Sequence, residues 1–272
     1  MRRFWVSSVL VISLLLTGVL VVGAQEMDDA CAPEAVLASF GAAEDVPAWQ
    51  AEVLAGDCSM RVKNAVVAMV SAYNSMIPVE FGPSPYVDLE QSVTEEGFPM
   101  LGSADAPMSI AMYESFGCGY CAQFSDNQFQ EMLANVAAGE INVAFVMVTN
   151  QFSVAASVAG VCAQEQDMFW EMHDILFNLL ENYGQEAFDI NRIMLVAEDL
   201  GLDMDAFQAC MNDSATYEVL DVANEAFYAL SEDNEGVTGT PTITFNGEPP
   251  EFGSGSVPLE FIQEQIAAAQ EG

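Results

Sequence analysis

The sequence is poor in basic residues. It has 5 lysines and arginines against 41 aspartates and glutamates, which gives a formal net charge of −36 at pH 7. So negative a surface repels nucleic acid and anionic membranes, and neither is expected as a partner. Because 52% of the residues are hydrophobic, the acidity indicates a solvated coat on a folded protein. The coat suits high salt or an acidic medium, and attraction of basic client chains is the alternative explanation.

Histidine is scarce as well, and the cysteines are few. His173 is the only histidine in the sequence, and among six cysteines only Cys118 and Cys121 form a C-x-x-C pair. A structural zinc ion needs four soft ligands, usually two such pairs or one pair with histidines. Neither a metal site nor a cofactor is therefore expected. His173 lies in an aromatic-rich helical pattern and is interpreted as a core residue rather than as a catalytic base.

The C-x-x-C pair lies between a predicted strand and a predicted helix. An apolar run at 108–113 precedes it, and apolar residues recur at helical spacing from 121 to 136. At such a junction, free backbone N–H groups and the helix dipole favour a thiolate at Cys118. Cys121, one turn further on, is placed to attack a mixed disulfide at Cys118 and resolve it. The pattern predicts thiol–disulfide exchange, with a purely structural disulfide as the alternative.

Several segments together resemble the DsbA-like branch of the thioredoxin-fold oxidoreductases. Besides the cysteine pair, they are LGSADAP at 101–107, CAQEQ at 162–166, FWEMH at 169–173, LGLD at 200–203 and GVTGTPT at 236–242. The resemblance covers residues 99–270. It implies a thioredoxin fold and an enzyme that exchanges disulfides with exported client proteins. A membrane or soluble redox partner would recycle such an enzyme.

The resemblance also implies a second half of the site at Thr240-Pro241. In similar proteins this proline is cis and faces the C-x-x-C pair, and the exposed backbone of Thr240 can pair with an extended client strand. Thr240 is expected to tune the redox potential and client release. Gly119-Tyr120 between the cysteines differs from the dipeptide of strong oxidants, and C-G-Y-C is similar to the tetrapeptide of disulfide isomerases.

One position departs from the family pattern. Six residues before the first cysteine, many thioredoxin-fold enzymes keep a buried carboxylate that relays protons, and this chain has Met112 there. Glu114 lies two residues further along the same strand face. It is predicted either to take over part of the relay or to be another surface acid.

Residues 1–24 have the pattern of a signal peptide or an N-terminal anchor. Arg2 and Arg3 precede an apolar run at 4–22, and the small residues before Gln25 offer a cleavage site. The run is also long enough to span a bilayer, so an uncleaved anchor is the alternative. Either way the site is expected outside the cytoplasm, on a protein that is secreted, periplasmic or anchored.

Residues 25–98 are predicted to form a separate helical segment, with helices after Pro33, around Trp49 and at 60–77. Cys31 and Cys58 flank the first two helices. A bridge between them would close about 28 residues and contribute roughly 3–4 kcal/mol through chain entropy. The segment is interpreted as a packing appendage, with a client-binding or dimerising module as the alternative.

Residues 99–272 are predicted to form the α/β thioredoxin domain. The expected elements are a strand at 109–114, a helix at 118–138, a parallel strand at 141–148, an all-helical insertion at about 152–233, a strand at 242–245, an edge strand near Phe252 and a helix at 258–269. Cys162 and Cys210 lie on two helices of the insertion. A bridge between them would contribute about 4 kcal/mol. Two free thiols, or a pairing of Cys58 with Cys162, are the alternatives.

The predicted function is that of an extracytoplasmic thiol–disulfide oxidoreductase that introduces disulfides into exported proteins. Cys118 would be the attacked sulfur and Cys121 the resolving one. A disulfide isomerase or reductase of the same fold is one alternative. A non-catalytic client-binding chaperone module with an inert disulfide is the other.

Overall fold

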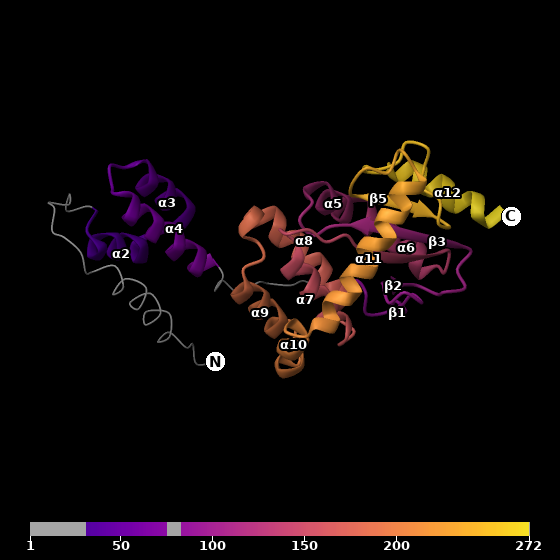
Figure 1. The fold of residues 1–272 in the computed structure, drawn as a ribbon, viewed down its shortest axis with the longest axis horizontal. Helices are drawn as coiled ribbons and strands as arrows, with labels where there is room; N and C mark the ends of the chain where they lie inside the picture. Colours follow the sequence, from indigo (N-terminus) through magenta and orange to yellow (C-terminus); the bar gives the residue numbers. More distant parts are fainter. Residues whose placement is uncertain (1–30, 75–82, 272) are drawn as a thin grey trace. The chain divides into compact units, whose positions relative to one another are not determined.

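The chain folds into two compact units, Met1–Ile77 and Pro78–Gly272 (Figure 1). The computed structural model describes residues 31–74 and 83–271. The predicted signal peptide or anchor at 1–24 lies outside these residues. Over the two described ranges, no helix combines the length and the apolar character needed to cross a membrane.

Three helices make up the described part of the first unit: α2 (Pro33–Ala42), α3 (Val46–Ala55) and α4 (Met60–Asn74). Phe40 is the centre of a small core, because its ring packs edge-on against both Trp49 and Tyr73 with centroids 5.2 Å apart. Cys31 and Cys58 form a disulfide with a Cα–Cα distance of 5.4 Å. So small a core has little apolar area to bury, which makes a covalent link useful.

A five-stranded sheet organises the second unit, in the order β1-β2-β4-β3-β5. Its strands are β1 (Gln91–Val93), β2 (Pro99–Leu101), β3 (Met108–Glu114), β4 (Ile141–Met147) and β5 (Thr242–Phe245). β3 and β4 are parallel, as predicted, and the other neighbours are antiparallel. All seven residues of β4 are buried. Phe145 points into the main core and Val146 packs near Ala223 of α11 (Ser214–Asp233), so helices cover both faces of this strand.

The two short strands place the unit boundary earlier than expected. The sequence analysis put it at residue 98, but residues 83–98 pack with the second unit because β1 pairs with β2. Tyr86 strengthens this attachment: it is fully buried, and its hydroxyl donates a hydrogen bond to Asp174 at 2.7 Å. Three-residue strands are too short to show a periodic pattern, which is why β1 and β2 were not predicted.

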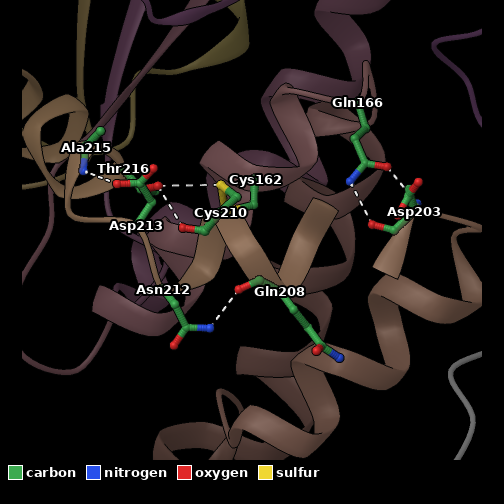
Figure 2. The surroundings of a disulfide bond; sticks show 9 residues. All are labelled: Cys162, Gln166, Asp203, Gln208, Cys210, Asn212, Asp213, Ala215 and Thr216. Carbon is green, nitrogen blue, oxygen red and sulfur yellow. Dashed lines mark hydrogen bonds between the residues drawn. A yellow bond between two sulfur atoms is a disulfide. The ribbon is translucent and has the colours of Figure 1, made fainter. Parts of the chain in front are cut away.

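The predicted insertion is built of helices, and five of them are long elements. They are α7 (Val154–Gln164), α8 (Phe169–Tyr183), α9 (Ile190–Asp199), α10 (Met204–Met211) and α11 (Figure 1). Asp189, Asp203 and Asp213 cap the last three by accepting hydrogen bonds from backbone N–H groups. Cys162 of α7 and Cys210 of α10 form the second disulfide, with a Cα–Cα distance of 5.7 Å (Figure 2). Both disulfides follow the pairing that the sequence analysis favoured.

The prediction of an edge strand near Phe252 was wrong. Asn246 and Gly247 do make a tight turn with positive φ, and Phe245 and Glu248 exchange two backbone hydrogen bonds across it. Pro249 and Pro250 follow at once, and proline has no N–H to continue a strand ladder. The chain instead forms a loop that leads to α12 (Leu259–Glu271).

Candidate active site

The active-site cysteines open the helical segment that follows β3. Cys118 is the N-cap of α5 (Gly119–Phe124), and its carbonyl accepts the first helical hydrogen bonds, from Cys121 and Ala122. A π-helical turn (Ser125–Phe129) and α6 (Gln130–Ala137) continue the segment, where one unbroken helix was predicted. Both thiols are free, Cys118 partly exposed and Cys121 completely buried. Gly119 and Tyr120 between them are exposed.

The two thiols have opposite electrostatic environments. Hydrogen bonding from the Cys121 thiol, the Thr240 side chain and the backbone N–H groups of Cys121 and Tyr120 outweighs partial burial and lowers the pKa of Cys118 to about 5. Burial raises the pKa of Cys121, and its hydrogen bond to Cys118 and the charge of Glu114 raise it further. At neutral pH the pair therefore holds one thiolate, at Cys118, and one thiol.

The Thr240-Pro241 turn lies against Cys118, although 122 residues separate them in the chain. Antiparallel pairing of β5 with β3 brings the turn, which directly precedes β5, to this end of β3. In its protonated form Cys118 donates a hydrogen bond from Sγ to the Thr240 carbonyl at 3.3 Å. The Thr240–Pro241 peptide bond is cis, and Pro241 is buried. The structure thus brings the two predicted halves of the site together.

Glu114 is the last residue of β3 and is completely buried. This excludes the alternative that it is a surface acid. Neither carboxyl oxygen has a hydrogen-bond partner among the residues that the structure describes. Burial raises the pKa of Glu114 well above its usual range, and the charge of Cys118 raises it further. Met112, at the usual position of the buried carboxylate, is buried as well and carries no proton to transfer.

His173 lies in the core behind the active-site loop. It is completely buried, and its Nδ1 is 2.9 Å from a carboxylate oxygen of Asp174. Six aromatic rings surround it, those of Phe116, Phe129, Phe145, Phe169, Trp170 and Phe177. These contacts agree with its interpretation as a core residue.

Two serines beneath the active-site loop were missed by the sequence analysis. Ser115 is nearly buried, and its hydroxyl accepts a hydrogen bond from the N–H of Gly117 at 3.4 Å and donates one to Ser153 at 3.2 Å. Ser153 is fully buried just before α7. The two hydroxyls tie the loop before Cys118 to the helical insertion. No local signal marks them, because serine is common in exposed loops and only the fold places these two in contact.

The fold and the pair of thiols are those of the thioredoxin family. The chain belongs to this family, whose family model matches residues 94–264. Its fold is that of the DsbA-like thiol–disulfide oxidoreductases. MdbA, a thiol-disulfide oxidoreductase from Corynebacterium diphtheriae, has a similar structure, with a TM-score of 0.55 and 23% identity, over 66% of this chain and 94% of that one.

Two curated proteins are also similar in sequence. Na(+)/H(+) antiporter NhaA 3 of Salinispora tropica is 28% identical over 163 residues, which is 59% of this chain and 23% of the antiporter. Disulfide bond formation protein D of Bacillus subtilis is 28% identical over 96 residues, 34% of this chain and 43% of that protein. The chain thus spans less than a quarter of the antiporter and less than half of the second relative.

Proposed function

We propose that this protein is an extracytoplasmic thiol–disulfide oxidoreductase that introduces disulfides into exported proteins. The contrast between Cys118, whose pKa is lowered to about 5, and the buried Cys121 carries the proposal. A stabilised thiolate favours the reduced form of the pair, which makes its disulfide a better oxidant. The same property argues against an inert disulfide in a chaperone module, and it favours an oxidase over a reductase. The similarity to MdbA and to disulfide bond formation protein D supports the same chemistry.

The reaction begins with the Cys118–Cys121 disulfide. A client thiolate attacks Sγ of Cys118, so a mixed disulfide forms and the Cys118–Cys121 bond breaks, with the electron pair leaving on Cys121. A second client thiolate then attacks the client sulfur and releases Cys118 as a thiolate. The client loses two electrons and two protons. The enzyme gains both electrons and keeps one proton, on Cys121, while the other goes to solvent.

Glu114 is proposed to supply the proton that Cys121 takes up. Its raised pKa favours the neutral acid, which can donate to the leaving thiolate of Cys121, and the two groups interact electrostatically. A carboxyl group with no competing hydrogen-bond partner among the described residues is free to turn toward the sulfur. In the reverse direction the carboxylate accepts the proton of Cys121 and turns it into the attacking thiolate.

Clients are proposed to bind beside Cys118, along the backbone of the Thr240-Pro241 turn. An extended segment can pair with that backbone while its cysteine reaches Sγ of Cys118. Tyr120 is 69% exposed next to the sulfur and offers an aromatic surface to the client. A membrane or soluble redox partner that reoxidises the pair would use the same exposed sulfur. Export fits the two further disulfides, because such bonds persist in oxidising compartments.

The test uses the full chain in its oxidised form with a reduced two-cysteine client peptide. We expect one peptide disulfide to form for each Cys118–Cys121 pair that is reduced. In a glutathione series, the reduction potential of this pair should be well above that of a structural disulfide. In a second arm the reduced single-cysteine variants meet the disulfide form of the same peptide: the Cys118 thiolate of Cys121→Ser should attack it, release one peptide thiolate and accumulate as the mixed disulfide, and Cys118→Ser, the matched control, should not. A pair that resists mild thiol and never oxidises the peptide would refute the proposal.

A further inference from the structure

The loop after the β5 turn wraps around the segment that carries Thr240 and Pro241. Five hydrogen bonds join residues 253–255 to residues 236–242. Two of them are between backbone groups: the N–H of Ser254 donates to the Gly236 carbonyl at 3.0 Å, and the N–H of Gly255 donates to the Pro241 carbonyl at 2.8 Å. The other three converge on one atom, the hydroxyl oxygen of Ser254.

The Ser254 hydroxyl is completely engaged with this segment. It accepts hydrogen bonds from the N–H groups of Thr238 at 2.8 Å and Gly239 at 3.0 Å. Oγ1 of Thr242 lies 2.7 Å away and donates its own proton to the Gly239 carbonyl, also at 2.7 Å. A hydroxyl has one proton, so Ser254 must be the donor to Thr242. The residues on both sides of Thr240-Pro241 are therefore fixed by one side chain.

Backbone packing places Ser254 in this position. Gly253 has φ of +72°, and a Cβ built there would lie 2.0 Å from the Gly236 carbonyl oxygen. Only glycine permits so close an approach of the two backbones, because any side chain would push the loop away. The next residue, Ser254, is thereby directed into the turn.

We propose that Ser254 is a positioning residue of the redox site: its hydroxyl holds the Thr240-Pro241 turn against Cys118 and so sets the reactivity of that sulfur. The inference rests on the proposed function. Ser254 acts through Thr240, which contacts Sγ of Cys118 with its carbonyl oxygen. A turn that loses its anchor moves the hydroxyl and carbonyl of Thr240 relative to the sulfur, and exchange rates are sensitive to displacements of this kind.

The experiment compares Ser254→Ala with Ser256→Ala in the full chain. Ser256 is an exposed serine of the same loop whose hydroxyl accepts a hydrogen bond from Gln128 and which has no bond to residues 236–242 among those described. We measure the rate of exchange with oxidised glutathione at pH 7 and the pH midpoint of Cys118 alkylation. Ser254→Ala should slow exchange about three- to tenfold and raise the midpoint by about half a unit or more. Ser254→Thr, which keeps the hydroxyl, should restore most of the rate.

Thr242→Val is a second variant, for the case in which Ser254→Ala does not fold, because it removes the other hydroxyl of the network at constant shape. It should shift rate and midpoint in the same direction. Unchanged rate and midpoint with only a lower melting temperature, or equal effects of Ser254→Ala and Ser256→Ala, would overturn the inference. Failure of the unmodified enzyme to exchange with glutathione would instead refute the proposed function, so the two results are distinguishable.

Discussion

The lowered pKa of Cys118 predicts that acid removes a stabilisation that only the reduced protein has. The pKa is about 5 in the folded protein against 9 for an unperturbed thiol. A group whose pKa is depressed by folding contributes stability that is complete above its unfolded pKa and is lost as pH falls through its folded pKa. The oxidised protein has no thiol at this position. The difference in unfolding free energy between the two forms should therefore depend on pH.

The size of the effect follows from the two pKa values. Between pH 7 and pH 4 the thiolate of Cys118 becomes protonated in the folded state, which removes about two pKa units of stabilisation, or roughly 2.7 kcal/mol. Because the sulfur is partly exposed, solvent screening reduces this to about 1.5–2.5 kcal/mol. Contributions from carboxylates away from Cys118 are common to both forms and cancel in the difference.

The assay is denaturant unfolding of the reduced and oxidised proteins at pH 4 and pH 7, with two free thiols verified in the reduced sample. We expect the unfolding free energy of the reduced form, measured relative to the oxidised form, to be lower at pH 4 than at pH 7 by about 1.5–2.5 kcal/mol. Reduced Cys118→Ser is the control and should lack this change. A difference between the two forms that is the same at both pH values would refute the low pKa and, with it, the electrostatic argument for an oxidant.

Three further variants test the redox site and the disulfide of the helical insertion. Glu114→Gln should slow release of the mixed disulfide about 100-fold in stopped-flow exchange. It should also raise the melting temperature at pH 7, because the carboxylate of the unfolded chain must take up a proton when Glu114 is buried and the amide need not. Equal rates would remove Glu114 from the relay. Thr240→Val should raise the pH midpoint of Cys118 alkylation by about one unit and make the disulfide less oxidising. An unchanged redox potential would mean that the turn has only a structural role. Replacing Cys162 and Cys210 together by Ala should lower the unfolding free energy by about 4 kcal/mol with exchange chemistry intact, and lost exchange in folded protein would contradict a purely structural bridge.

The sequence alone predicted the features that local patterns encode. A C-x-x-C pair between an apolar strand and an amphipathic helix defines both the position and the asymmetry of Cys118 and Cys121. Helix periodicity gave the order of the helices in the insertion, because an amphipathic stripe persists over several turns. The Thr240-Pro241 turn was found through the resemblance of its surrounding motif, since nothing in the residues themselves points to a sulfur more than a hundred positions away.

Tertiary structure decided the features that depend on contacts between distant segments. β1 and β2 form because each finds a partner strand, and three residues carry no pattern of their own. Glu114 is completely buried in the assembled fold, although an acidic residue at the end of a strand is usually exposed. Ser254 reaches the redox site only because two glycines let two loops touch. Hydrogen bonds and burial of single polar side chains leave no periodic trace in a sequence, and only the assembled fold reveals them.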